Sequence, residues 1–354
     1  MSMSTLTPIS SAQERIERAR GAFYGLALGD AFGMPTQSLS RARIVAQFGR
    51  ITTLVDARAD QPIAPNMPAG SITDDTEQAV LVGELLVAGQ GTIEPRVFAQ
   101  RLIEWEASMK ARGSLDLLGP STKRAIQMII DGEAPDQSGR FGTTNGAAMR
   151  VTPVGIAADL HDHAAFIDAV VQSCRVTHNT TLGIASAAAV AAAVSAGIEG
   201  ASLAEALDAG AALADAGEAH GYWVAGGRIG ERIRWAREFV VQGSADAIPQ
   251  KLYDVVGTSV ASQESVVAAF ALASDAALRG IDIGASLGVA ASLGGDTDTI
   301  AAMLGAMLGA CAGYRALPRD LIDTVRRVNR LDLDPLVGQL LALRAQRTRS
   351  ARST

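Results

Sequence analysis

Apolar residues recur at three- and four-residue intervals along almost the whole chain, which is the period of an α-helix. Strand-like alternation is almost absent, and only Ile51 to Val55 hints at a strand. The pattern therefore predicts an all-α fold in which loops carry the polar chemistry. The predicted helices are Glu14 to Ala31, Ser40 to Phe48, Thr73 to Ala88, Pro95 to Ala111, Lys123 to Ile130, a piece starting at Asn145, a helix opened by Arg175 and running to Val194, Ser202 to Asp215, Gly226 to Val241, Ser265 to Leu278, Ala285 to Leu293, Thr297 to Ala312 and, with interruptions, Leu321 to Leu343.

Two of these helices carry glycines spaced four residues apart. The first stripe is Gly21, Gly25 and Gly29, and the second is Gly305, Gly309 and Gly313. Four-residue spacing places small residues on one face of a helix, where another backbone can approach closely. We expect both stripes to pack tightly at the centre of the core.

No repeat period and no interdomain linker divides the chain, whose 354 residues are 48% hydrophobic. This length and composition allow a large buried core, in which we expect Trp105, Trp223 and Trp235. We predict a single domain over residues 13–343, preceded by a flexible N-terminus at 1–12. The arginine-rich end at 344–354 is expected to be a flexible basic tail.

The net charge of −6 is mildly acidic and argues against a nucleic-acid partner, whose binding surface would be basic. The longest uncharged runs, 180–198 and 284–295, are too weakly hydrophobic or too short for membrane spans, so we expect buried helices. Cys174 and Cys311 have small or apolar neighbours, as reduced thiols of cytoplasmic proteins do. We therefore expect no secretory signal, no membrane partner and a cytoplasmic location. The oligomeric state is not indicated, although a monomer is slightly favoured.

Two glycine-led segments far apart in the chain carry carboxylates and threonines in a similar order. They are Gly70 to Thr76 (GSITDDT) and Gly294 to Thr299 (GGDTDT), and an apolar helical pattern follows each. Residues two apart in a regular helix face nearly opposite ways, so Asp296 and Asp298 converge only if Asp296 lies at or before the N-cap. The preceding glycines permit such an opening. We predict that the two openings meet in space.

Carboxylates at a helix opening can simply cap the helix, and each segment alone is compatible with that role. Four converging carboxylates, however, repel one another unless a cation lies between them. Oxygen ligands without a nearby His or Cys favour Mg²⁺, Mn²⁺ or Ca²⁺ over zinc. Together with two threonine hydroxyls they could hold two ions about 3.5–4 Å apart. The predicted metal ligands are Thr73, Asp74, Asp75, Asp296, Asp298 and Thr299.

At these segments the chain resembles the ADP-ribosylglycohydrolase family, which includes the glycohydrolase that reactivates dinitrogenase reductase. The similarity spans nearly the whole chain in order. Its motifs are the glycine-rich Gly21 to Gly33, GSITDDT at Gly70 to Thr76, TNGAAMR at Thr144 to Arg150, VTH at Val176 to His178, and GGDTDT at Gly294 to Thr299. The resemblance implies a single-domain orthogonal bundle of helices with a centre of two Mg²⁺, or Mn²⁺, ions.

The resemblance also implies a reaction. By position, the six predicted ligands match the two metal-binding clusters of the family, whose ions engage the vicinal hydroxyls of a ribose and a water. Hydrolysis of the bond at C1 of the ribose develops positive charge, which nearby carboxylates stabilise. Asp75 or Asp298 could take the proton of the water, and the sequence does not choose between them.

Further residues match positions that contact the substrate in the family. His178 matches a residue near the substrate, and Gln37 stands where many members carry Glu. A glutamine hydrogen-bonds a hydroxyl group but cannot act as a base. The loop amides that hold the diphosphate of the substrate correspond to Gly119, Ser121, Thr122, Asn145 and Gly146, although Gly119 to Thr122 could equally be a plain helix cap.

We therefore predict a metal-dependent hydrolase of a glycosidic bond in an ADP-ribosyl substrate, either an ADP-ribosylated protein or a small molecule. Gln37 leaves room for a smaller substrate, such as a nucleoside or another N-riboside. A non-catalytic, metal-stabilised structural or binding protein of the same fold is a further alternative. A phosphoryl-transfer enzyme is the weakest alternative, because the chain lacks a phosphate-loop lysine motif.

Overall fold

The computed structural model describes residues 11–114 and 118–351, so the N-terminus predicted to be flexible lies almost wholly outside the described residues. Within these ranges the chain is helical, and extended residues form only isolated bridges, which confirms the all-α class. The α-helices are α1 (Ala12–Gly33), α2 (Arg41–Phe48), α3 (Asp74–Ala88), α4 (Pro95–Ala111), α5 (Pro120–Ile130), α6 (Gly146–Met149), α7 (Thr152–Ala157), α8 (His163–Cys174), α9 (Thr181–Ile198), α10 (Leu203–Gly217), α11 (Ile229–Gln242), α12 (Ile248–Lys251), α13 (Ser262–Arg279), α14 (Ile283–Ala291), α15 (Thr297–Ala312), α16 (Arg319–Asn329) and α17 (Asp334–Ala351).

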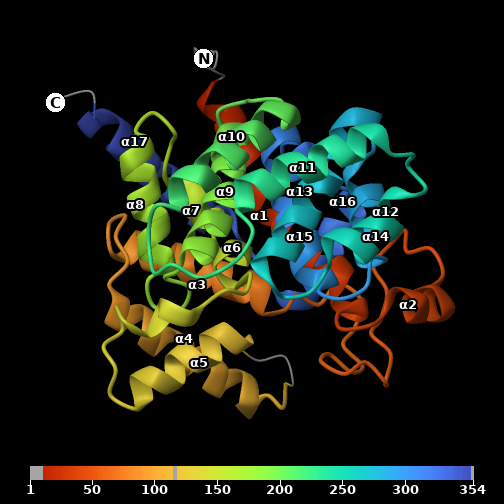
Figure 1. Cartoon of the computed structure of the whole chain (residues 1–354), viewed down its shortest axis with the longest axis horizontal. Helices are drawn as coiled ribbons and strands as arrows, with labels where there is room; N and C mark the ends of the chain where they lie inside the picture. Colours follow the sequence, from red (N-terminus) through yellow and green to blue (C-terminus); the bar gives the residue numbers. More distant parts are fainter. Residues whose placement is uncertain (1–10, 115–117, 352–354) are drawn as a thin grey trace.

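Helices α1 and α15 lie at the centre of the molecule (Figure 1) and touch backbone to backbone. A Cβ atom built on Gly25 would lie 2.2 Å from the carbonyl oxygen of Gly305, and one on Gly305 would lie 2.0 Å from that of Gly25. Gly21 and Gly309 face each other in the same way. The tight packing predicted for both glycine stripes is confirmed, and each stripe is the partner of the other. We call this contact the glycine seam.

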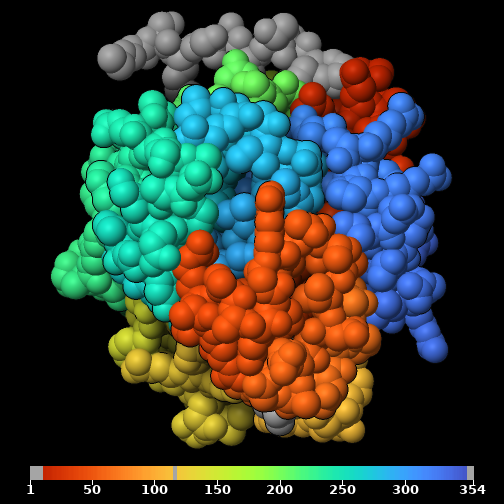
Figure 2. Space-filling model, turned by 90° about the vertical axis from the view of Figure 1, so that its right-hand side faces the viewer, coloured from red at the N-terminus to blue at the C-terminus, as the bar shows by residue number. Residues whose placement is uncertain are grey.

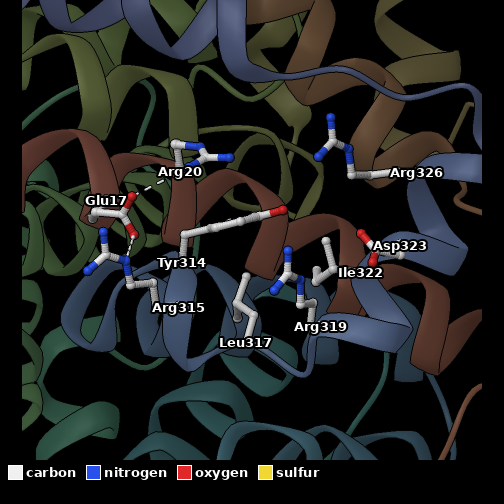
Figure 3. Close-up of a pocket in the computed structure, with 9 residues that line it drawn as sticks. All are labelled: Glu17, Arg20, Tyr314, Arg315, Leu317, Arg319, Ile322, Asp323 and Arg326. Atoms are coloured by element: carbon white, nitrogen blue, oxygen red, sulfur yellow. Dashed lines mark hydrogen bonds and ion pairs between the residues drawn. The ribbon is translucent and has the colours of Figure 1, made fainter.

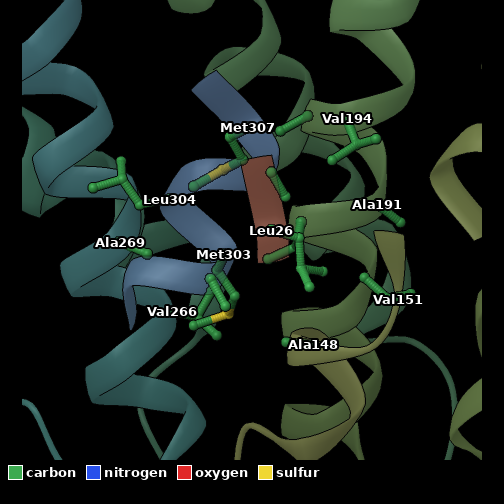
Figure 4. Packing of buried hydrophobic residues seen from close by; sticks show 14 of the residues in the cluster. Leu26, Ala148, Val151, Ala191, Val194, Val266, Ala269, Met303, Leu304 and Met307 are labelled. Atoms are coloured by element: carbon green, nitrogen blue, oxygen red, sulfur yellow. The ribbon is translucent and has the colours of Figure 1, made fainter. Parts of the chain in front are cut away.

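The large hydrophobic core surrounds the glycine seam. Leu26 of α1 and Met303 of α15 lie among side chains of α9 and α13 (Figure 4). By length and composition α9 could cross a membrane, but 94% of it is buried inside the protein. It is therefore a core helix, as predicted for residues 180–198.

The segment between α1 and α3 forms one flank of the molecule. In Figure 2 this segment, red to orange, faces the viewer and lies against later parts of the chain, cyan to blue. Leu39 forms an isolated bridge with Gly295, and a Cβ atom on Gly288 would lie 2.2 Å from the carbonyl oxygen of Ile51. The flank thus reaches the opening of α15.

Several predicted elements are wrong in detail. The described residues form no strand at 51–55, and helices α7 and α8 were not predicted. The last predicted helix is two helices, because Arg330 takes a left-handed conformation (φ 52°) and ends α16. Trp223 and Trp235 are 80% and 42% exposed, so the core placement fails for both. Trp235 instead stacks on Phe239 along the outer side of α11.

The basic tail predicted from residue 344 does not begin there, because α17 continues to Ala351. The guanidinium group of Arg344 is buried and donates to the carbonyl oxygens of Gly155 and Ala158 and to Glu199 Oε1. A buried charge keeps its place only when such partners surround it. Arg344 therefore anchors α17 to the core.

Candidate functional site

The two predicted carboxylate clusters meet at a cavity of about 230 Å³. It lies where α1 ends and where α3, α5 and α15 begin. Nine of the predicted site residues line it, namely Gln37, Asp74, Gly119, Thr122, Asn145, Gly146, Asp296, Asp298 and Thr299, and its other lining residues include Ser38, Ile63, Leu118, Pro120, Lys123, Thr144, Met149 and Val260.

The opening of α15 has the non-helical geometry that the sequence requires. Asp296 is the N-cap residue, with φ −90° and ψ 61°, and Asp298 lies in the first turn. Gly294 and Gly295 both have positive φ angles, of 90° and 80°, which side chains rarely adopt. A Cβ atom on Gly33 would lie 2.3 Å from the Cα of Asp298, so the glycine seam runs into this opening and fixes it against α1.

The opening of α3 is held by a residue that was not predicted, Asp30. Thr73 is the N-cap residue of α3, and its backbone N–H and hydroxyl both donate to the Asp30 carboxylate, the hydroxyl at 2.7 Å. Thr76 donates to Asp30 Oδ2 in the same two ways. Asp30 is fully buried, and burial raises its pKa to about 6. The carboxylate of α1 thus caps α3 from outside and places Thr73 beside the other ligands.

The carboxylates of the two openings act on one another. Burial, and then the negative charge of Asp298, raise the pKa of Asp75 well above its ordinary value. Burial also raises the pKa of Asp296 to about 6, against hydrogen bonds from Asn145 and Thr299. Folding therefore gathers acidic groups where their charges are disfavoured, which is the electrostatic condition of a cation site.

The donor set fits a hard divalent cation, although its geometry is not ready made. In the part of the chain that the structure describes, no three His, Cys, Asp or Glu side chains already form a metal-binding group. Asp75 Oδ2 accepts hydrogen bonds from the hydroxyls of Thr73 and Thr299, both at 3.2 Å, whereas its buried Oδ1 has no hydrogen-bond partner within residues 11–114 and 118–351. An ion held here would need threonine or water oxygens to complete its shell.

The structure separates the predicted substrate residues into two groups. Gln37, Gly119, Thr122 and Gly146 line the cavity, and Gln37 Nε2 is buried without a hydrogen-bond partner among the described residues. Ser121, by contrast, accepts hydrogen bonds from the backbone N–H groups of the 143–144 loop.

Asn145 and His178 contact residues that line the cavity through their side chains. The backbone N–H of Asn145 donates to the Val260 carbonyl oxygen, and its side chain donates to Asp296 Oδ2 at 2.5 Å and to Ser265. The Asn145 amide is therefore engaged within the protein and is not free for a diphosphate. His178 is fully buried and lies behind two residues that line the cavity, Gly146 and Thr144, whose hydroxyl lies 2.9 Å from Nε2.

A larger pocket, of about 570 Å³, lies at the other end of α15 (Figure 3), where Arg20, Arg319 and Arg326 surround Tyr314. Arg20 stacks over the Tyr314 ring at 4.0 Å and pairs with Asp334. None of the predicted site residues lines it. Arg326 lies 5.4 Å from the centre of the Tyr24 ring and pairs with Asp332, so these contacts give Arg20 and Arg326 a structural role.

The fold and the cavity define an all-α protein in which carboxylates and threonine hydroxyls gather at the N-termini of α3 and α15. Comparison with known proteins identifies the family. The ADP-ribosylglycohydrolase family model matches residues 11–350, and the chain belongs to this family. It is a hydrolase of the ADP-ribosyl-hydrolase type.

Three relatives illustrate the similarity. The uncharacterized protein YegU of Escherichia coli (strain K12) is 33% identical over 94% of this chain and 99% of its own length. ADP-ribosyl-[dinitrogen reductase] glycohydrolase of Rhodospirillum rubrum is 32% identical over 47% of this chain and 53% of its own. ADP-ribosylarginine hydrolase Tri1 of Pseudomonas putida (strain GB-1) is 25% identical, covering 91% and 76%.

A solved structure of an ADP-ribosylglycohydrolase-related protein complex superimposes with a TM-score of 0.65 at 25% identity. The match covers 94% of this chain and 98% of that one. The single-domain fold implied by the resemblance is therefore confirmed.

Proposed function

We propose that this chain hydrolyses the glycosidic bond between C1 of an ADP-ribosyl group and a nitrogen or oxygen atom, with two Mg²⁺ or Mn²⁺ ions as cofactors. The observation that carries the proposal is the convergence of residues 73–75 and 296–299 on one cavity. Relatives named for the ADP-ribosyl-[dinitrogen reductase] and ADP-ribosylarginine reactions support this substrate class.

The six predicted ligands take complementary places around the cavity. Asp74, Asp296, Asp298 and Thr299 line it, while Asp75 is fully buried and shares its Oδ2 with two threonine hydroxyls. When bound, the ions would lower the pKa of a water and orient the ribose hydroxyls. Asp298 is the better candidate for the base that takes the water's proton, because it faces the cavity and Asp75 does not.

The opening of α5 is the best candidate for binding the phosphates. Gly119 is its N-cap residue, and both Gly119 and Thr122 line the cavity together with Lys123. The first backbone N–H groups of a helix and a lysine side chain both favour an anion. The diphosphate would therefore lie across the cavity from the acidic centre.

The size of the cavity supports a second candidate. At about 230 Å³ it is smaller than the roughly 300–1,000 Å³ of most ligand pockets. Gln37 also replaces the acidic residue that many family members carry. A smaller N-riboside, such as a nucleoside, would fit a space of this size. The location of the protein in the cytoplasm and its slightly favoured monomeric state also remain predictions.

A substrate panel separates the two candidates. ADP-ribosyl-arginine, ADP-ribosyl-serine and simple N-ribosides would be incubated with Mg²⁺ or Mn²⁺, with and without chelator, and the released sugar measured. Asp298→Asn should abolish turnover. The control variant Asp246→Asn changes an exposed carboxylate that does not line the cavity, so it should keep its turnover. Equal turnover by the wild type and Asp298→Asn would refute the site. Mg²⁺ binding by calorimetry tests the metals without reference to activity.

A further inference from the structure

Arg150 is among the largest fully buried side chains, yet it has no carboxylate within ion-pair distance among the described residues. Its guanidinium group lies 5.0 Å from the centre of the Phe98 ring, and its Nε has no hydrogen-bond partner in the described part of the chain. Burial lowers its pKa only to about 10, so it stays charged at neutral pH. A buried cation without a paired anion is costly, which raises the question of what it does.

One arm of Arg150 leads to the acidic centre. Its Nη1 donates to Gln78 Oε1 at 2.7 Å, and Gln78 Nε2 donates to Asp74 Oδ2 at 2.8 Å. An arginine can only donate, so the atom of Gln78 that faces it must be the oxygen. The amide nitrogen is thereby turned toward Asp74. Through Gln78, Arg150 therefore sets the orientation of Asp74, a predicted metal ligand in the first turn of α3.

The other arm leads to the opposite wall of the cavity. Nη2 of Arg150 donates to Thr177 Oγ1 at 2.5 Å, and Thr177 Oγ1 lies 2.8 Å from His178 Nδ1. His178 Nε2 in turn lies 2.9 Å from the Thr144 hydroxyl, and Thr144 lines the cavity. Gly146 makes this possible, because a Cβ atom there would lie 2.9 Å from the imidazole.

The direction of each hydrogen bond in this arm follows from the arginine. Burial lowers the pKa of His178 well below its ordinary value, so the ring is neutral and one nitrogen carries the proton. If Nδ1 carried it, the buried Thr177 hydroxyl would have no acceptor for its own hydrogen among the residues that the structure describes. Thr177 therefore donates to Nδ1, and the proton of His178 resides on Nε2 and points to Thr144. The Thr144 hydroxyl accepts it, and its own hydrogen is then available to an acceptor in the cavity that Thr144 lines.

We propose that Arg150 is a positioning residue for both walls of the cavity, and that its second arm makes the Thr144 hydroxyl a fixed donor to a phosphate oxygen of the substrate. The contact with a phosphate rests on the proposed ADP-ribosyl substrate, whereas the relay through Thr177 and His178 does not. A hydroxyl whose oxygen accepts from a polarised chain donates more strongly, so it suits an anionic acceptor.

Nitrogen NMR of the imidazoles tests the relay without any substrate. The chain has only four histidines, and His178→Gln assigns the signal. In the wild type we expect Nδ1 unprotonated and Nε2 protonated. Thr177→Val removes the donor to Nδ1 and should shift the ring toward a mixture of tautomers, whereas Thr177→Ser should keep the wild-type signal. A protonated Nδ1 in the wild type, or an unchanged ring in Thr177→Val, would overturn the relay.

The contact with the substrate is tested by affinity and kinetics. Thr144→Val should weaken ADP-ribose binding and raise KM by roughly tenfold, the equivalent of one hydrogen bond, with kcat nearly unchanged. Thr144→Ser should retain wild-type values, and a riboside without phosphate should bind both variants alike.

Equal ADP-ribose affinity of the two Thr144 variants, in proteins with unchanged melting temperatures, would overturn the phosphate contact. If the wild type does not bind ADP-ribose at all, the proposed function fails together with this contact, and the tautomer of His178 still decides the relay.

Discussion

The glycine seam makes a sharp prediction about stability. In Gly25→Ala the new Cβ atom would lie 2.2 Å from the backbone oxygen of Gly305, whereas ordinary contact begins at 3.4 Å. The obstacle is backbone on a rigid helix, so no side chain can rotate away. The two central helices must therefore separate by about 1.2 Å, and they lose packing along their whole length.

The magnitude follows from two opposing effects. Overpacking of this kind costs typically 1–3 kcal/mol and here falls at the upper end of that range or beyond it, about 3 kcal/mol. Alanine in place of a helical glycine returns roughly 0.5–1 kcal/mol through lower backbone entropy in the unfolded chain. We expect a net loss of about 2 kcal/mol in the free energy of unfolding. Because the seam runs into the opening of α15, the affinity for Mg²⁺ should fall as well.

Gly338→Ala is the matched control, because Gly338 lies within α17 and a Cβ atom there meets nothing within 4 Å. It should gain roughly 0.5–1 kcal/mol. Denaturant unfolding followed by circular dichroism would measure both variants. If Gly25→Ala were as stable as the wild type, or moved in the same direction as Gly338→Ala, the packing explanation of the seam would be wrong.

Further predictions concern the acidic centre and the C-terminal helix. Asp30 and Asp296, with pKa values raised to about 6, bind protons more tightly in the folded state, so the metal-free protein should lose stability as the pH rises from about 4 through 6. Melting curves with chelator or Mg²⁺ should show a larger stabilisation by the ion at pH 8 than at pH 5, and an equal effect at both would refute the linkage. Asp30→Asn should weaken Mg²⁺ binding about tenfold in calorimetry, relative to Asp246→Asn, because Thr73 loses its charged acceptor. Gln37→Glu should add a titrating limb to the pH profile of kcat that the wild type lacks, since glutamine does not titrate. Arg344→Leu should cost about 3 kcal/mol in denaturant unfolding, because it leaves Glu199 and buried carbonyl groups without their donor, whereas removal of a truly flexible tail would cost nothing.

Much of the site could be predicted from the sequence because it depends on local rules. Residues two apart in a helix cannot face one point, which placed Asp296 before the first turn of α15, and the structure has it at the N-cap. Four-residue glycine spacing predicted the tight packing of α1 and α15, and one of the two carboxylate clusters opens α15. These features require only the period of the helix and the absence of a side chain.

The features that the sequence could not predict depend on contacts between segments that are far apart in the chain. Asp30 lies 43 residues before Thr73, and no local pattern connects the two. Its one signal is that it is a carboxylate next to Gly29 in the second half of α1, which is otherwise uncharged. Asn145 was assigned to the substrate because its neighbours resemble anion-binding loops, but Val260 and Asp296 occupy its donors. In the sequence, nothing distinguishes Arg344 from the other arginines near the C-terminus. Only the structure shows the carbonyl oxygens that surround it.

The packing of the glycine seam keeps the buried carboxylates close to one another. Burial, and then the negative charges of Asp298 and Asp30, raise the pKa of Asp75, so its charged form is disfavoured. Asp30 of α1 caps α3, so α3 would follow α1 if α1 and α15 moved apart, and that movement would relieve the repulsion between Asp75 and Asp298. Backbone contact at Gly25 and Gly305 leaves no slack for that movement, and Thr297 holds the last turn of α1 through the carbonyl oxygen of Gly33 at 2.9 Å. The repulsion is therefore kept in the folded state rather than relaxed, and bound protons at low pH or a cation at higher pH can neutralise it. Rigidity at the seam is in this way a requirement of the metal site that we propose at its end.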